Sequence, residues 1–330
     1  MPKLEGLQLL RALAALMVLI GHVIAEAEHY FGIALAPGNL PWTRGVDIFF
    51  VISGFIITLS AARYRRRPVA FLQRRMLRVV PLYYLFTTLM VATLILAPDA
   101  TKDTQLEVGQ VLSSYLFLPF ERHDGRIAPV LSLGWTLNYE VFFYALMATC
   151  LALGRPILAI SVTICGLSVL SLLSFEATAP KFWTNPLILE FLYGVLLARL
   201  WRQGHRYPSA PLAAFSGALA LGLMVTLHDT DLPRFLAVGL PSALLVAAGT
   251  IFCPPRPLPM QLIGDASFAL YLSHRFTLRL LTLTLLPMLP PNAAWLYVAV
   301  ACVLSLLIGL LCHLLLERPL ARQVVRSADA

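Results

Sequence analysis

Long apolar runs recur along the whole chain of 330 residues and constrain its fold more than any other feature. Hydrophobic residues make up 59% of the sequence and charged residues only 13%, which excludes an ordinary soluble domain. A helix needs about 20 mostly apolar residues to cross a bilayer. Runs of this kind predict an all-α integral membrane protein with about ten transmembrane helices, at residues 7–25, 45–61, 79–97, 131–151, 156–175, 186–202, 211–228, 234–252, 262–285 and 294–316.

The first run is too polar at its outer end for a secretory signal peptide, and no small-residue cleavage site follows it, so we expect a retained helix. The longest connection, residues 98–130, contains Pro98, Pro119, Gly125 and Pro129, which favour irregular structure. We therefore expect a single membrane domain over residues 1–330 with no appended soluble domain.

The distribution of charge predicts the orientation. The connection between the second and third predicted spans has no acidic residue and seven arginines, at positions 63, 65, 66, 67, 74, 75 and 78. Basic connections stay on the cytoplasmic side. Further arginines at 155, 199, 202, 206, 256, 318, 322 and 326 fall on the same side, and acids at 26, 28, 99, 103, 107, 121, 124, 229 and 231 fall on the other. With ten spans, both termini are predicted to be cytoplasmic.

The net charge of +8 is explained by this insertion pattern, so we expect no nucleic-acid partner. The five cysteines contain no C-x-x-C pair and lie mainly in or beside apolar runs, at positions 150, 165, 253, 302 and 312. They indicate neither a metal site nor a disulfide framework.

Arg11 and His22 are ionisable residues within the first apolar run. Their separation returns to almost the same face of a helix, at about 100° per residue, and places them roughly 16 Å apart. Ionisable side chains in a span are costly and usually functional. One stripe of this helix is thus expected to carry a cation near the cytoplasmic end and a titratable base near the outer end.

Other polar residues lie in or at the ends of predicted spans. Asp47 is placed at a depth similar to that of His22, where a carboxylate would fix the tautomer of an imidazole base. Glu140, Glu190 and His274 also fall in apolar runs. For each residue alone, a structural hydrogen bond inside the helix bundle and a catalytic role both remain open.

Arg74, Arg75 and Arg78 lie at the entrance of the third predicted span, at spacings that share one helical face. Guanidinium groups suit bidentate contacts with phosphate. We expect a phosphorylated ligand at Arg75 and Arg78, and the alternative is an anchor for the cytoplasmic surface.

Seven sequence blocks occur in an order that resembles the membrane acyltransferase-3 family, in particular its branch that modifies exopolysaccharides. They are Leu4-Glu5-Gly6-Leu7, Arg11-x10-His22, the stretch GVDIFFVISGF from Gly45 to Phe55, Arg75-x-x-Arg78-x-x-Pro81, Trp135-Thr136-Leu137-x-x-Glu140-x-x-x-Tyr144, the stretch from Ser267 to His274, and Glu317-Arg318-Pro319. Thr136 stands where the family usually has serine, and Arg275 where an uncharged residue is expected.

The resemblance implies O-acylation, usually acetylation, of an envelope or exopolysaccharide sugar, with acetyl-CoA or another acyl-CoA as donor substrate and no permanently bound cofactor. It assigns catalysis to His22 and donor binding to Arg75 and Arg78. We add the hypothesis that Asp47 or Glu140 orients His22 and that Arg11 helps to hold the donor. The remaining motif residues are candidates for an acceptor site or a structural polar site: Ser53, Trp135, Tyr144, Tyr271 and His274.

The resemblance also implies a location in the bacterial cytoplasmic (inner) membrane. The partners it implies are the lipid bilayer, a saccharide or lipid-linked saccharide acceptor, and polysaccharide assembly proteins. Two other functions stay open. Buried Arg, His and Glu in many spans also occur in transporters or flippases of glycans or small solutes. Transfer to a lipid or small-molecule acceptor is the third alternative.

Overall fold

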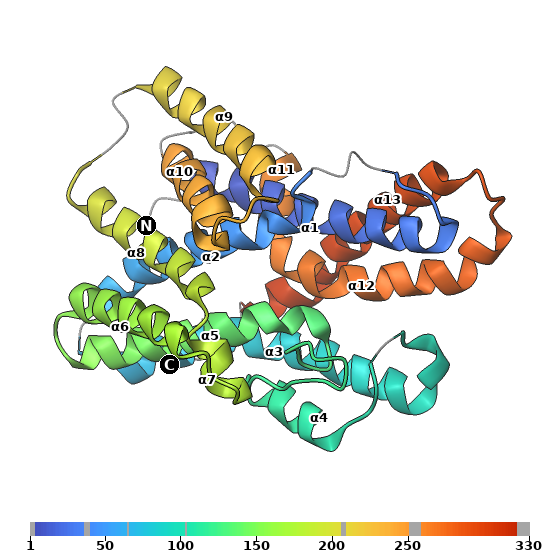
Figure 1. Ribbon diagram of the computed structural model, residues 1–330, viewed down its shortest axis with the longest axis horizontal. Coiled ribbons are helices and arrows are strands. Elements are labelled where there is room, and N and C mark those ends of the chain that lie inside the picture. Colours follow the sequence, from blue (N-terminus) through green and yellow to red (C-terminus); the bar gives the residue numbers. More distant parts are fainter. Residues whose placement is uncertain are drawn as a thin grey trace. The chain divides into compact units, whose positions relative to one another are not determined.

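Helices make up most of the computed structural model, which describes residues 4–35, 40–64, 66–102, 104–205, 209–250 and 259–321 (Figure 1). Within these ranges no strand is assigned, and one isolated bridge pairs Glu121 with Ile127. The all-α prediction is confirmed for this part of the chain. Some residues used above for orientation and cysteine pairing lie outside the described residues: Arg65, Asp103, Arg206, Cys253, Arg256, Arg322 and Arg326.

The α-helices of the described chain are α1 (Glu5–Phe31), α2 (Gly45–Ala61), α3 (Pro68–Leu96), α4 (Val108–Tyr115), α5 (Trp135–Ala152), α6 (Pro156–Leu170), α7 (Thr178–Trp183), α8 (Leu189–Arg202), α9 (Ala210–Leu227), α10 (Leu240–Gly249), α11 (Pro259–Asp265), α12 (Ser267–Thr284) and α13 (Ala294–Cys312). Short 3₁₀ helices are η1 (Trp42–Arg44), η2 (Ala62–Tyr64), η3 (Pro98–Ala100), η4 (Ser132–Gly134), η5 (Ser171–Leu173), η6 (Pro186–Ile188) and η8 (Leu286–Met288). Two π-helical turns are η7 (Phe235–Gly239) and η9 (His313–Glu317).

Several helix ends follow from local sequence. Pro68 and Pro156 stand in the first turns of α3 and α6, where a missing N–H costs nothing. Ser209 caps α9 by accepting a hydrogen bond from the backbone N–H of Leu212. Gly32 ends α1 with φ of 66°, a left-handed conformation that glycine adopts without strain.

Two helices are longer than their apolar runs. Helix α1 continues to Phe31, beyond the predicted end at residue 25, and α3 begins at Pro68, before the predicted start at residue 79. The reason is that hydropathy reports only the part of a helix suited to lipid, whereas polar residues continue the helical hydrogen bonding.

The described chain divides into two compact units. The first unit comprises Met1–Phe49 and Arg206–Pro319 and contains α1, the start of α2 and α9 to α13. In it, α12 and α13 pack together and against α1 (Figure 1). Leu19, Leu270 and Tyr297 are part of the buried core that these three helices share. Gly309 permits the close approach, because a Cβ at this position would collide with the backbone and side chain of Leu270.

The second unit comprises Phe50–His205 and Leu320–Ala330, and its helices include most of α2 together with α3 to α8. Helices α2 and α8 meet through a reciprocal pair of glycines. A Cβ on Gly54 would strike the carbonyl of Phe191, and a Cβ on Gly194 would strike the carbonyl of Val51. Small residues of this kind let two helix backbones approach closely in membranes.

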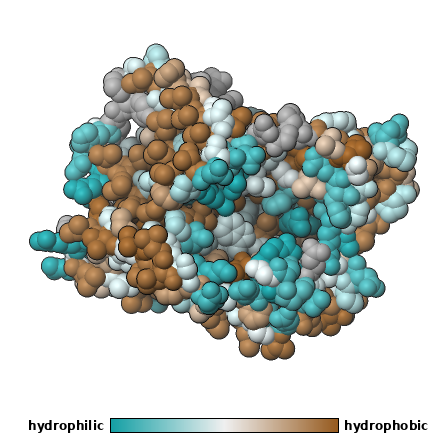
Figure 2. All heavy atoms as spheres, in the orientation of Figure 1, coloured by the Kyte–Doolittle hydropathy of each residue, from teal (hydrophilic) through white to brown (hydrophobic). Residues whose placement is uncertain are grey.

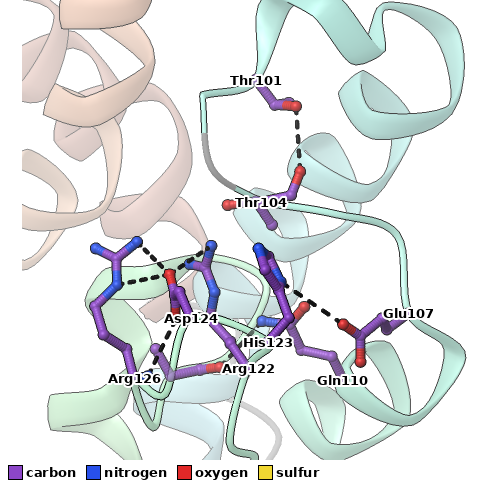
Figure 3. Close-up of polar contacts among 9 residues, drawn as sticks. Thr101, Thr104, Glu107, Gln110, Arg122, His123, Asp124 and Arg126 are labelled. Atoms are coloured by element: carbon purple, nitrogen blue, oxygen red, sulfur yellow. Dashed lines mark hydrogen bonds and ion pairs between the residues drawn. The ribbon is translucent and has the colours of Figure 1, made fainter.

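The connection at residues 98–130 is more ordered than its prolines predicted, since it contains α4. The phenol of Tyr83 donates to the carbonyl of Ser114 at 3.2 Å and thereby ties α4 to α3. Figure 3 shows a second polar cluster, in which Asp124 accepts hydrogen bonds from Arg126 and lies beside Arg122. The side-chain hydrogen bond from Arg126 lowers the pKa of Asp124 to about 2.

Six helical segments of the described chain are long and apolar enough to cross a membrane: Glu5–Phe31, Trp42–Tyr64, Pro68–Leu96, Pro156–Leu173, Ala210–Leu227 and Ala294–Ala321. Large apolar side chains are exposed on several of them, including Leu96, Leu172 and Trp295. Figure 2 shows many hydrophobic side chains on the visible surface. This exposure fits helices solvated by lipid.

The four other predicted spans also contain helices, but these fall short in length or hydropathy. Helices α8 and α10 are short, and α5 and α12 carry polar residues such as Glu140 and His274. The count of ten spans and the cytoplasmic termini therefore remain predictions.

Candidate functional site

His22 in α1 lies against His274 in α12. The Nδ1 atom of His22 and the Nε2 atom of His274 are 3.0 Å apart, and the second ring also bonds through Nδ1 to the carbonyl of Leu270 at 3.0 Å. His274 is 1% exposed, while His22 is half-buried. The family motif thus places its histidine in a defined hydrogen-bonded pair with a side chain more than 250 residues away.

Arg11, one of the predicted donor-binding residues, also contacts α12. Its guanidinium donates to the hydroxyl of Ser267 at 2.8 Å and to the side chain of Gln8 at 3.1 Å. Arg11 and His22 therefore meet the same neighbouring helix, as expected for residues on one stripe of α1.

A third polar contact between these helices was not foreseen. Glu26 was assigned to an outer connection, but it lies within α1, is buried, and accepts a hydrogen bond from Thr282 at 2.9 Å. Thr282 is also 3.1 Å from the phenol of Tyr297 in α13. The spacing of four residues after His22 was the available signal, since it places Glu26 on the same helical face.

Asp47, a predicted catalytic partner of His22, is instead bound by Arg234 beside η7. Both carboxylate oxygens accept hydrogen bonds from the guanidinium, each at 2.8 Å. Asp47 is 0% exposed, and the side chain of Arg234 is 33% exposed. The structure thus brings His22 together with His274, and Asp47 together with Arg234.

Glu140 belongs to a polar cluster of the second unit. It accepts hydrogen bonds from the phenol of Tyr144 and, at 3.4 Å, from the hydroxyl of Ser53. The guanidinium of Arg75 lies 5.9 Å from the ring centres of Tyr144 and Phe71. Three other predicted site residues, Ser53, Tyr144 and Arg75, are therefore gathered near the carboxylate of Glu140.

The two arginines of the R-x-x-R motif have different environments. Arg75 is 8% exposed and donates to the carbonyl of Ile56 at 3.4 Å, whereas Arg78 and Arg74 are exposed. A buried guanidinium over aromatic rings is a rigid cation, and an exposed one is available to a ligand in solution.

The two remaining candidates, Trp135 and Tyr271, each lie beside the ring of a neighbouring residue. Trp135 at the start of α5 meets Phe50 edge to face, with ring centres 6.1 Å apart. The ring centre of Tyr271 lies 6.2 Å from that of His274.

Comparison with known proteins gives consistent results. The acyltransferase domain family matches residues 4–314. Exopolysaccharide production protein ExoZ of Rhizobium meliloti (strain 1021) is 33% identical over 317 residues, which cover 92% of this chain and 94% of ExoZ. Acyltransferase MdmB of Streptomyces mycarofaciens is 26% identical over 312 residues, covering 84% of this chain and 79% of MdmB.

Peptidoglycan O-acetyltransferase OatA of Listeria monocytogenes is 25% identical over 342 residues, which cover 88% of this chain. The match covers 51% of OatA, so the chain spans about half of that protein. No solved structure matches the chain.

The family match runs through α1, with Arg11 and His22, and through α12, with His274. The long apolar helices agree with an enzyme embedded in a membrane. On this basis the chain belongs to the acyltransferase-3 family and is a membrane acyltransferase.

Proposed function

We propose that this protein transfers an acetyl group from acetyl-CoA to a hydroxyl group of an envelope or exopolysaccharide sugar. The names of two relatives support a sugar acceptor and an acetyl group. ExoZ is an exopolysaccharide production protein, and OatA is a peptidoglycan O-acetyltransferase. The observation that carries the proposal is the position of His22, half-buried within α1 and with its Nδ1 atom 3.0 Å from Nε2 of His274.

His22 acts as the general base in this proposal. The acceptor oxygen attacks the thioester carbonyl while the imidazole removes its proton, a C–O bond forms and the C–S bond breaks. The proton then passes from the imidazolium to the departing thiolate of coenzyme A. General-base catalysis typically contributes about 10²–10⁴-fold in rate. An acyl-histidine intermediate is the other route by which the same residue can carry the group.

The donor is held by Arg78 and Arg75, with Arg11, in this proposal. Arg78 is exposed and suited to make the first contact with the phosphates, and Arg75 adds a positive charge fixed over Phe71 and Tyr144. We expect Arg78→Ala to raise KM for acetyl-CoA more than it lowers kcat. An unchanged KM would make Arg78 a surface anchor, and Arg74→Ala is the matched control on the same helix.

Asp47 and Glu140 have supporting roles in the proposal, because each carboxylate has a partner other than His22. Asp47 pairs with Arg234, and Glu140 binds Tyr144 and Ser53. Trp135 and Tyr271 are retained as candidates to line the acceptor site.

Ten spans with cytoplasmic termini are proposed for the topology. Arg11, His22 and Glu26 contact α12 at Ser267, His274 and Thr282, in the same order, so α1 and α12 run parallel. Parallel spans need an odd number of crossings between them. The ten-span prediction places seven spans between α1 and α12, which is an odd number. Only four of the six long apolar helices lie between them, and this even number would make α1 and α12 antiparallel.

The protein is placed in the cytoplasmic membrane of a bacterium, with residues 1–330 acting as one acyltransferase domain. Its partners are the surrounding lipid, a saccharide or lipid-linked saccharide acceptor, and proteins of polysaccharide assembly. The arginine-rich connections support an orientation in which they and both termini face the cytoplasm.

Mass spectrometry of surface polysaccharides tests the function. Cells carrying the intact protein are compared with cells lacking it and with cells carrying His22→Ala or, as a control, His29→Ala, which alters an exposed histidine of the same helix. We expect an acetyl increment only with the intact protein and His29→Ala. Identical polysaccharide profiles in all cells would rule out a polysaccharide as the acceptor. A lipid acceptor, a small-molecule acceptor or a transport function would then be tested.

A further inference from the structure

The hydrogen-bond chain from Leu270 through His274 to His22 determines where the protons lie. A backbone carbonyl only accepts hydrogen bonds, so the Nδ1 atom of His274 carries the hydrogen that reaches Leu270. A neutral imidazole has one hydrogen. Burying a charge is costly, and the ring of His274 contacts no carboxylate in the part of the chain that the structure describes, so this ring is neutral. The Nε2 atom of His274 therefore holds a lone pair.

That lone pair faces the Nδ1 atom of His22 at 3.0 Å. The ring planes are 27° apart and the ring centres 5.1 Å apart, a separation much larger than the distance between the two nitrogens. The rings thus meet edge to edge and nearly in one plane, which is the geometry of an N–H pointing at a lone pair. The donor must be His22, so its hydrogen is on Nδ1.

We propose that His274 is a positioning residue that holds His22 in the Nδ1–H tautomer, leaving the Nε2 lone pair as the atom that removes the proton from the acceptor hydroxyl. This inference rests on the proposed function of His22. It gives His274 the role that carboxylates perform beside many catalytic histidines.

The same contact also stabilises the reaction intermediate. When His22 accepts a proton at Nε2, its Nδ1–H becomes a charge-assisted donor to the neutral ring of His274, and such hydrogen bonds are roughly twice as strong as neutral ones. The proton taken from the hydroxyl group of the sugar therefore stays on His22 until it passes to the thiolate of coenzyme A.

The Nε2 atom of His274, which accepts the hydrogen bond from His22, is rigidly held. The ring of His274 is tied to the carbonyl four residues earlier in its own helix, and Leu270 packs tightly against Gly309 of α13. The bonds from Arg11 to Ser267 and from Thr282 to Glu26 fix α1 and α12 on either side of the pair. Little rearrangement is needed to keep the two rings aligned.

Nuclear magnetic resonance of protein with ¹³C- and ¹⁵N-labelled histidine measures the tautomer directly. The chain has seven histidines, and the signals of His22 are assigned by their loss in His22→Ala. We expect His22 with hydrogen on Nδ1 in the unmodified protein, and finding hydrogen on Nε2 instead overturns the proposal. Because this measurement needs neither acceptor nor turnover, it stands even if the proposed sugar acetylation fails.

Three substitutions separate positioning from packing. His274→Gln keeps an acceptor oxygen near the position of Nε2, His274→Asn keeps a polar group only near Nδ1, and His274→Met fills the space without a comparable acceptor. We expect His274→Gln to retain most of kcat, and the other two to lose about 10²-fold or more, with KM for acetyl-CoA unchanged.

The signals of His22 should follow the same order. They remain those of the Nδ1–H tautomer in His274→Gln and shift toward the Nε2–H tautomer in His274→Met. Wild-type kcat in His274→Met, or an equal loss in folded His274→Gln and His274→Met, would refute the assignment.

Discussion

Asp47 and Arg234 form an ion pair, and we expect removal of the arginine to lower the free energy of unfolding more than removal of the aspartate. Removing one partner of a buried pair costs about 3–5 kcal/mol, because the other charge is left without compensation. Asp47 is 0% exposed, so Arg234→Ala leaves a carboxylate that cannot reach water, and we expect a loss of about 5 kcal/mol. The side chain of Arg234 is 33% exposed and can turn toward solvent, so Asp47→Ala should cost about 3 kcal/mol or less.

Unfolding of the purified protein by sodium dodecyl sulfate in mixed micelles, followed by tryptophan fluorescence, measures these losses. Asp47→Ala, Arg234→Ala and the double variant form a cycle in which we expect a coupling free energy of about 2–3 kcal/mol. Asp99→Ala removes an exposed aspartate and serves as the control, with a change of about 0.5 kcal/mol or less.

Two results would contradict this reasoning. Losses that add in the double variant would show that the two charges do not depend on each other, and a larger loss in Asp47→Ala would reverse the argument from burial. Transfer per folded molecule decides the other role considered for Asp47. An orienting partner of His22 predicts that Asp47→Ala lowers transfer while Arg234→Ala preserves it, whereas a structural pair predicts equal transfer in both.

Three further predictions concern the second unit. Gly54→Val should lower the free energy of unfolding by about 1–3 kcal/mol, because the new side chain has no space against α8. Gly166→Val in α6 meets open space and should be nearly neutral, and equal effects of the two substitutions would contradict the close contact. Tyr144→Phe should cost about 1–3 kcal/mol through the lost hydrogen bond to Glu140, and wild-type stability in the same denaturation assay would count against that bond. Asp124 has a pKa of about 2, below its ordinary value of about 3.9, so its contribution is complete above pH about 4 and lost toward pH 2. Limited proteolysis of the 98–130 connection should therefore be the same at pH 5 and 7 and faster in Asp124→Asn, and a difference between the two pH values in the unchanged protein would argue against it.

Apolar periodicity predicted helices well where the apolar run and the helix have nearly the same ends. The predicted spans at 45–61 and 211–228 coincide with α2 and α9 to within one residue. The start of α3 was missed because residues 68–78 are helical but rich in arginine, and hydropathy alone does not report such a segment.

The candidate residues were recognised from sequence more readily than their partners. Arg11 and His22 were placed on one face of α1 because the helical repeat requires it. The choice of His274 as the partner of His22, in place of Asp47 or Glu140, depends on which helices pack together. One sequence contains no local signal for that choice, since 252 residues separate the two histidines.

The contacts along α1 and α12 give a physical reason for placing a base inside a membrane helix. Association of helices in lipid depends on close packing and polar contacts, because the tails are as apolar as the side chains. The bonds at Ser267 and Thr282 bracket the ring pair, so α1 cannot slide or rotate against α12 without breaking them first. Catalytic groups need such positioning to within fractions of an ångström. Ser267, His274 and Thr282, which hold α1 and His22, are thus among the polar residues that lower the hydropathy of α12, together with Arg275 and Arg279.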